Sequence, residues 1–275
     1  MSPDHQPAPD ADPIDAEGLR VAGRLGSVEV LTEAASTMDR GREIAADPAA
    51  TLPAAVVADR QTAGRGRRGA AWWQPPGSLA VSLVVAGTVS RDGPRPLWSL
   101  ACGVAVAETI RALEPAVEPR VRWPNDVHVD GRKLAGILVE TAAGGRVIVG
   151  VGINTSGSAA DAPPALRPRV ATLPDLTGRM LPRQRFLAAF VPRLLDLLAA
   201  TDEPAAVLDR YRPLCGLTGQ PVRVYVGDVV QEGICRGIAA DGGLVVETTT
   251  GPVVIRSGSL AAPGTEWRGD PGRPG

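Results

Sequence analysis

Short apolar runs bounded by Gly, Pro, Asp or Ser constrain the fold of this chain more than any other feature. They lie at 28–32, 54–59, 78–85, 134–141 and 146–154, and their length predicts strands. Two longer segments carry apolar side chains at helical spacing and predict helices at 96–113 and 183–200. Two shorter helices are expected, one from a cap at Ser36 or Thr37 to about Ala46 and one at 204–212.

The pattern changes after Cys215. Short strands with Gly or Asp-Gly turns follow, at 221–226, 229–238, 242–248 and 251–257. This stretch is too short to be the main domain and predicts a small β-barrel. We therefore expect a main domain over 21–215 and a small domain over 216–261. The flanking segments 1–20 and 262–275 are rich in Pro, lack periodicity and are expected to be disordered tails.

Composition excludes several classes of protein. The 275 residues are 44% hydrophobic and 21% charged, and the formal net charge of −1 gives no global reason to expect DNA binding or a polybasic membrane anchor. The apolar runs fall short of the roughly 20 residues that span a bilayer, and the polar N-terminus is unlike a signal peptide, so we expect a cytoplasmic protein. The cysteines form no CxxC pair, which argues against a zinc ribbon; they are Cys102, Cys215 and Cys235.

Three residues stand out because their types are rare in this chain. Lys133 is the only lysine among 29 basic side chains, and Asn125 and Asn154 are the only asparagines. The abundance of Gly, Ala, Pro and Arg is typical of GC-rich coding, under which an exchangeable Lys drifts to Arg. Lysine is a compact point charge and arginine a planar fork, so a retained lysine indicates a site that the fork does not fit. Chance retention is the alternative.

The segment from Asp59 to Trp72, DRQTAGRGRRGAAW, is basic and rich in glycine. Its four arginines and one aspartate give a local charge of +3. Flexible backbone N–H groups and guanidinium groups are suited to closing over phosphates. The string GRGRRG fits the dinucleotide fingerprint GxGxxG, but WWQPPG downstream does not continue as the required helix. The composition is also compatible with a short nucleic-acid patch or a solvated surface loop.

A second cluster surrounds the segment RWPND. Pro124 ends a strand, which leaves Asp126 available to bind Mg²⁺ or a nucleotide. Lys133 begins the next strand, within reach of the same hairpin mouth. Gly136 within that strand indicates the close approach of a ligand or another backbone. Farther on, GVGIN ends in Asn154, which offers both a donor and an acceptor. Ordinary turn chemistry is the alternative.

Together and in this order, the Ser36-Thr37 pair, ADRQTAGRGRRGAAW, RWPND, RKLAGIL and GVGIN resemble the biotin–protein ligase family. The resemblance covers residues 30 to 260 or so, and the combination of motifs is specific. It implies an α+β fold: a mixed sheet flanked by helices, as in class II aminoacyl-tRNA synthetases, followed by a C-terminal SH3-like β-barrel. It also implies an ATP-dependent ligase that forms biotinyl-5′-AMP from biotin and MgATP. Biotin then passes to a lysine of a biotin carboxyl carrier domain, such as that of acetyl-CoA carboxylase.

The resemblance also implies roles by motif position. Biotin would be bound by Ser36, Thr37, Gln61, Gly64, Arg65, Arg67 and Gly136. The nucleotide would be bound by Arg67, Arg68, Trp72, Arg122, Asn125, Asp126, Lys133 and Asn154. Lys133, Arg65 and Arg67 would be catalytic, and Asp126 would organise Mg²⁺ through ATP. Three positions depart from the common pattern: Ala70 replaces a frequent Arg, Arg122 a frequent Lys and Met38 a frequent Asn.

Some family members carry an N-terminal helix-turn-helix domain and also repress transcription. Here only about 25 residues precede the first predicted strand, too few for that domain, so we expect a monofunctional enzyme that binds no DNA and no membrane. The resemblance leaves monomer and homodimer both open. The alternatives are a lipoate- or octanoate-transferring relative of the same fold and a non-catalytic biotin-binding regulator.

Overall fold

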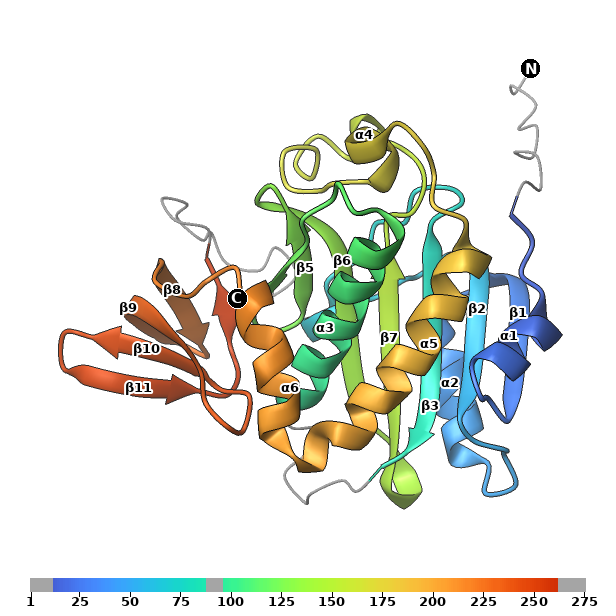
Figure 1. Cartoon of the computed structure of the whole chain (residues 1–275), viewed down its shortest axis with the longest axis horizontal. Coiled ribbons are helices and arrows are strands. Elements are labelled where there is room, and N and C mark those ends of the chain that lie inside the picture. The colour runs from blue at the N-terminus through green and yellow to red at the C-terminus, as the bar shows by residue number, and fades with distance from the viewer. Residues whose placement is uncertain (1–11, 88–95, 262–275) are drawn as a thin grey trace.

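A mixed sheet of seven strands forms the centre of the molecule. The computed structural model describes residues 12–87 and 96–261. The strand order is β1-β2-β3-β7-β6-β5-β4, with β1 parallel to β2 and the other neighbours antiparallel. The strands are β1 (Ser27–Ala34), β2 (Ala54–Gln61), β3 (Leu79–Ala86), β4 (Arg120–Arg122), β5 (Asp126–Val129), β6 (Arg132–Thr141) and β7 (Arg146–Ile153). The predicted α+β class with a mixed sheet is confirmed (Figure 1).

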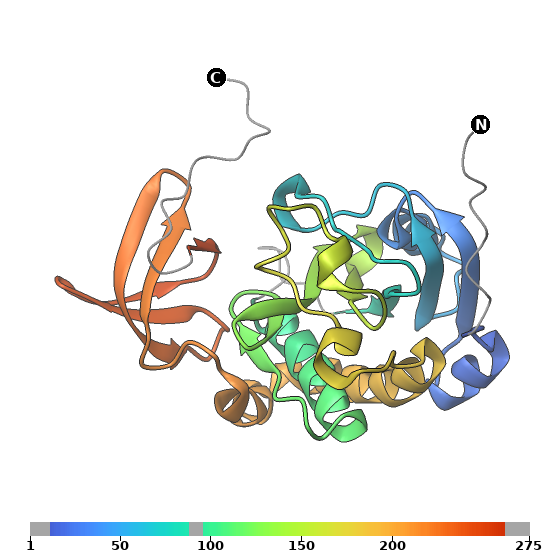
Figure 2. The ribbon, with the colours of Figure 1, turned by 90° about the horizontal axis from the view of Figure 1, so that it is seen from above.

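Helices cover the two faces of this sheet unequally. One face carries α1 (Ala16–Ala22), α3 (Pro96–Leu113), α5 (Arg183–Ala199) and α6 (Pro204–Tyr211), and the other carries α2 (Thr37–Ala46) (Figures 1 and 2). In strand β3, neighbouring side chains pack on opposite faces of the sheet. Val81 and Leu83 belong to the large core on the side of α3 and α5, whereas Val84 joins a smaller cluster beneath α2. Because one helix covers less area, the α2 face leaves room for a loop and a pocket.

The predicted elements between 28 and 212 are confirmed, with ends that differ by at most two residues. A short helix, α4 (Leu173–Thr177), was not expected. Helix α3 has the length and mean hydropathy (18 residues, 1.2) of a membrane span. Its packing against α5 and α6 accounts for that composition, because a helix buried on several sides is apolar all round.

The prediction of a disordered tail through residue 20 is wrong for residues 12–20, which the structure describes. Asp15 caps α1 by accepting a hydrogen bond from the Gly18 N–H at 2.9 Å, and Leu19 is fully buried. A single buried leucine in a Pro- and Asp-rich stretch is too weak a periodic signal to reveal the helix. The remaining tail residues, 1–11 and 262–275, lie outside the described residues.

The C-terminal part forms a separate antiparallel sheet with the order β11-β10-β9-β8-β12. Its strands are β8 (Pro221–Val226), β9 (Val229–Ile238), β10 (Leu244–Thr248), β11 (Gly251–Ile255) and β12 (Ser259–Leu260). The last, only two residues long, was not predicted.

This sheet is fixed to the main domain and shares its core. The indole N–H of Trp123 donates to Gly242 O at 3.1 Å. A Cβ on Gly242 would lie 2.3 Å from the backbone nitrogen of Leu97, so the β9–β10 turn rests directly on the start of α3.

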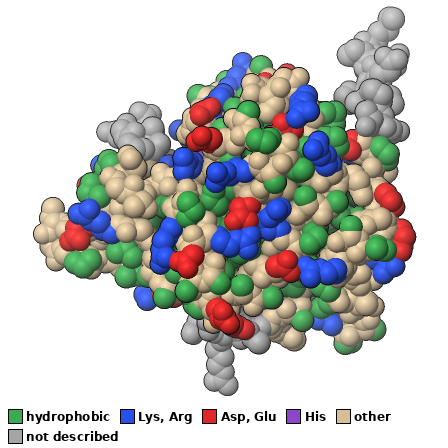
Figure 3. Space-filling model, in the orientation of Figure 1, with side chains coloured by type: hydrophobic (Ala, Val, Ile, Leu, Met, Phe, Trp, Pro, Cys, Tyr) green, Lys and Arg blue, Asp and Glu red, His purple; other side chains and the backbone are tan. Residues whose placement is uncertain are grey.

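Opposite charges are interspersed on the helix-covered face of the molecule (Figure 3). On this face Arg210 and Arg193 both pair with Glu108. At the pocket on the other face, by contrast, Arg67 and Arg122 are bound by backbone carbonyl groups.

Candidate active site

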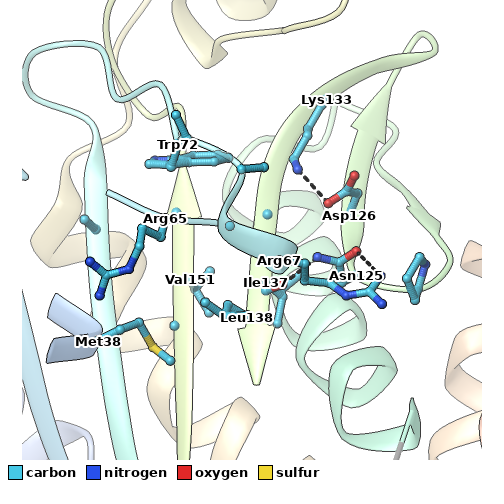
Figure 4. Close-up of a pocket in the computed structure, with 18 of the residues that line it drawn as sticks. Met38, Arg65, Arg67, Trp72, Asn125, Asp126, Lys133, Ile137, Leu138 and Val151 are labelled. Carbon is cyan, nitrogen blue, oxygen red and sulfur yellow. Dashed lines mark hydrogen bonds and ion pairs between the residues drawn. The ribbon is translucent and has the colours of Figure 1, made fainter. Parts of the chain in front are cut away.

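A pocket of about 260 Å³ opens on the α2 side of the sheet, against strands β3, β7 and β6 and under the loop that joins β2 to β3 (Figure 4). Most residues that the motifs singled out line it. They are Ser36, Thr37, Gln61, Arg65, Arg67, Trp72, Arg122, Asn125, Asp126, Lys133 and Gly136. The fold therefore brings the separate motifs together around one cavity.

Small residues form the floor of the pocket because the strand register places them side by side. Ala80 on β3 pairs with Gly152 on β7, Gly152 with Gly136 on β6, and Gly136 with Asp126 on β5. The Trp72 ring lies on this row. A Cβ on Gly152 would lie 2.5 Å from Trp72 Cε2, and one on Gly136 would lie 3.0 Å from Trp72 Cζ3. A larger residue at Gly152 would therefore displace the indole.

Lys133 and Asp126 form an ion pair at one end of this row. Lys133 Nζ lies 2.7 Å from Asp126 Oδ1 and 5.5 Å from the centroid of the Trp72 ring. Burial raises the pKa of Asp126, but the neighbouring Lys133 and His128 side chains lower it more, so the pKa lies below its usual range. Asp126 is an anion at neutral pH, and it holds the ammonium group inside the pocket.

Two arginines at the same end form no ion pair with a carboxylate in the described part of the chain. Arg67 Nη1 donates to Gly258 O at 3.2 Å, and Arg122 Nη2 donates to Ala261 O at 3.3 Å, so both are held by the backbone carbonyls that flank β12. Burial lowers the pKa of each guanidinium, and the charge of Arg68 adds to the effect at Arg67. Half-buried cations that form no ion pair attract an anionic ligand.

The opposite end of the pocket is polar, and the cation that lines it, Arg65, is neutralised by its ion pair with Asp39. Ser82 Oγ donates to Thr37 Oγ1 at 2.8 Å, and the Thr37 N–H donates to Gln61 Oε1 at 2.9 Å. Ser36 caps α2, with its Oγ accepting from the Met38 N–H at 3.3 Å. The Met38 side chain forms an apolar wall beside these groups. Hydroxyl and amide groups next to an apolar wall suit a neutral polar ring system.

The loop above the pocket folds back on itself. The Gly66 N–H donates to Ala70 O at 2.7 Å, and the Trp72 N–H donates to Gly64 O at 2.9 Å. Between them lies a single 3₁₀ turn, Arg67–Gly69, in which Arg68 has a left-handed φ of 55°. No helix follows in this loop, so GRGRRG is not a dinucleotide fingerprint here, as expected.

Some predicted site residues lie elsewhere. Arg65 borders the pocket, but its guanidinium pairs with Asp39 on α2, away from the Lys133–Asp126 pair (Figure 4). Arg68 Nη1 donates to Ser259 Oγ at 3.1 Å and does not line the cavity, and neither does Gly64.

Asn154 also lies outside the pocket lining. It is almost fully buried, and its Nδ2 donates to Ala171 O at 2.8 Å, which ties the end of β7 to the segment before α4. Its Oδ1 has no hydrogen-bond partner among the described residues. Its assignment to the nucleotide stays a prediction.

The motifs missed several residues of the pocket. Gly150, Gly152 and Val151 line it, and the spacing of the two glycines in GVGIN places both on one face of the strand, a signal that could have been used. Ser259 and Leu260 also line it, but they belong to a two-residue strand of the other sheet, and nothing in the local sequence indicates that position.

Comparison with known proteins identifies both parts of the chain. Residues 36–154 match the profile of the Biotin/lipoate A/B protein ligase family, and residues 217–260 match that of the Biotin protein ligase C terminal domain. The biotin--[acetyl-CoA-carboxylase] ligase of Mycobacterium tuberculosis is 34% identical over 217 residues, which cover 74% of this chain and 77% of that protein. The chain belongs to the biotin protein ligase family. The enzyme of the same name from Paracoccus denitrificans is 31% identical over 209 residues, covering 73% of this chain and 86% of that protein.

A solved structure of the family supports the same assignment. The biotin protein ligase from Aquifex aeolicus, solved in complex with biotin and ATP, superposes with a TM-score of 0.75 at 27% identity. The superposition covers 85% of this chain and 97% of that chain. The predicted class II synthetase-like catalytic domain and SH3-like C-terminal domain are thus the architecture of this family member.

Proposed function

We propose that this protein is an ATP-dependent biotin–protein ligase. In the first step a carboxylate oxygen of biotin attacks the α-phosphorus of ATP, which forms biotinyl-5′-AMP and releases pyrophosphate. In the second step the amine of a carrier lysine attacks the acyl carbon of that anhydride. The new amide loses a proton, and AMP leaves. The acceptor is a biotin carboxyl carrier domain of a biotin-dependent carboxylase.

The charge balance of the pocket carries this proposal. The described residues that line it include four cations, Arg65, Arg67, Arg122 and Lys133, and one carboxylate, Asp126. The first step requires a carboxylate to approach a triphosphate, so two anions must be held together. Fixed cations in a partly buried site offset that repulsion and stabilise the charge that develops in the transition state.

The two ends of the pocket suggest how the substrates lie. The neutral end at Thr37 and Gln61 would take the ureido ring of biotin, and the tail would run over Gly136 and Gly152 beneath Trp72. The carboxylate would then reach Lys133 at the charged end. The triphosphate would lie against Arg67 and Arg122, with Arg65 leaving Asp39 to meet an anion when substrate binds.

Asp126 fits a magnesium ion that arrives with ATP. The described residues contain no group of three metal-binding side chains, so a preformed protein cage is absent from them. Mg²⁺ is commonly held by one or two carboxylates together with substrate phosphates, and Asp126 is the carboxylate at the charged end. The ion would supply charge neutralisation at the phosphates.

Two further observations support the finer assignments. The match to the C-terminal domain of biotin protein ligases favours biotin over lipoate or octanoate as substrate. A cytoplasmic location accords with the supply of ATP and with three free cysteines.

Exchange of labelled pyrophosphate into ATP tests the proposal directly. Purified protein, Mg²⁺ and biotin should support exchange without any carrier, whereas lipoate and octanoate should not. Exchange with lipoate or octanoate alone would overturn the assignment of the substrate. Tight biotin binding without exchange would instead identify a non-catalytic regulator.

A further inference from the structure

One residue closes the neutral end of the pocket. Met38, on the first turn of α2, is 3% exposed and lines the cavity together with Thr37, Leu138 and Gly150. Figure 4 shows its thioether directed from α2 toward strand β7, on the side of the pocket away from the Lys133–Asp126 pair. A ligand whose carboxylate lies at the charged end therefore meets Met38 with its other end.

The protein holds Met38 firmly in this place. A Cβ on Gly150 would lie 2.6 Å from Met38 Sδ, so the sulfur rests directly against the backbone of β7. One turn along α2, a Cβ on Gly41 would lie 2.9 Å from Ile148 Cγ2, so the helix itself is seated on the same strand. Met38 also packs with Ala45, Val84 and other members of the small cluster beneath α2. The Met38 side chain therefore has little space in which to adopt another position.

The groups beside Met38 are mostly satisfied within the protein. Thr37 bonds to Gln61 and Ser82, and Ser36 caps α2. A thioether accepts hydrogen bonds only weakly, so this wall selects ligands by shape rather than by polar contacts.

We propose that Met38 is the specificity-determining wall for the ring system of the carboxylic acid substrate. The inference rests on the proposed function for the identity of that acid, biotin. The wall fixes how much bulk the neutral end accepts while the carboxylate stays at Lys133. One additional methylene in a packed pocket changes discrimination by about 10–200-fold, so removal of the thioether should be readily measured.

Ligand binding to three variants tests the wall without requiring catalysis. Met38→Ala removes it, and Met38→Leu refills nearly the same volume. Ile44→Ala is the matched control, because Ile44 packs against the same cluster but does not line the pocket. The ligands are biotin, homobiotin with one extra methylene in the tail, and the two biotins methylated on either ureido nitrogen. Calorimetry gives the ratio of each analogue's dissociation constant to that of biotin.

We expect Met38→Ala to bind biotin more weakly than the wild-type protein and to improve the relative affinity of at least one analogue by about tenfold or more. Met38→Leu and Ile44→Ala should keep the wild-type ratios. Unchanged ratios for all three analogues in Met38→Ala would overturn the proposal, as would an equal gain in Ile44→Ala. Failure of the proposed function appears differently, as absence of biotin-dependent pyrophosphate exchange in the wild-type protein.

Discussion

Lys133 reaches back across the β5–β6 hairpin to Asp126, and its ammonium group also lies 5.5 Å from the centroid of the Trp72 ring. The space is narrow: a Cβ on Gly136 would lie 3.1 Å from both Cε and Nζ of Lys133. The pair places a compact cation, rather than a planar one, where the two substrates are proposed to meet.

Replacement of Lys133 by arginine tests whether its shape matters as well as its charge. The planar guanidinium does not fit between Asp126 and Trp72, so we expect the rate of biotin-dependent pyrophosphate exchange to fall about 100-fold or more, equivalent to about 2.7 kcal/mol. Arg132→Lys, one position earlier on β6, is the control and should stay near the wild-type rate. Near-full activity of Lys133→Arg would show that its retention as the sole lysine is accidental.

Replacement of Gly152 by alanine should push the Trp72 ring off the pocket floor. The added methyl group would lie 2.5–2.8 Å from three atoms of the indole. We expect weaker binding of biotin and a loss of about 1–3 kcal/mol in the free energy of unfolding, measured by urea denaturation. In a Trp72→Ala background the same change should cost much less, because the clash is gone. Equal costs in the two backgrounds would contradict the contact.

We expect the Arg122 side chain to lower the stability of the fold and to strengthen the binding of ATP. Its half-buried charge has no carboxylate partner among the described residues, and burial lowers the pKa of its guanidinium. We expect Arg122→Met to unfold at the same or a higher temperature than the wild-type protein. At the same time the KM for ATP in the exchange assay should rise about tenfold or more, corresponding to about 1.4 kcal/mol. A lower unfolding temperature with unchanged KM would mean that the guanidinium serves the fold alone.

Protonation of Asp126 should account for part of the loss of folding stability at acid pH. Its pKa in the native protein lies below the ordinary value of 3.8, so the ionised carboxylate stabilises the folded state above that pH. This contribution is lost as the pH falls below 3.8 and through the lower native pKa. Urea unfolding between about pH 5 and pH 2 should therefore show a shallower decline in stability for Asp126→Asn than for the wild-type protein. Parallel curves would contradict the assigned pKa direction.

The periodic parts of the sequence predicted the fold well because burial leaves a repeating signal. Val81, Leu83 and Val85 alternate along β3, and the apolar stripe of α5 extends over many residues. Elements held by one or two contacts left no such signal. Helix α1 depends on Leu19 and a cap, and β12 consists of Ser259 and Leu260.

The candidate site was likewise predicted only in part from the sequence. Motifs identified the side chains that carry charge, because charged residues in a near-neutral protein are conspicuous. They did not give the partners of those side chains, since the contacts of Arg65 with Asp39 and of Arg67 with Gly258 depend on how distant segments pack. Met38 was noticed only as a departure from a family pattern. Its position beside Gly150 follows from the seating of α2 on the sheet, which no short motif encodes.

The contacts of Arg67 and Arg68 join residues 191 positions apart in the chain. All seven strands of the main sheet are synthesised long before Gly258 and Ser259. A polypeptide still emerging from the ribosome therefore contains every strand of that sheet while Arg67 and Arg68 still lack their partners in the C-terminal part. The contacts that hold Arg67 and Arg68 in the loop above the pocket thus form only after the C-terminal sheet has been synthesised.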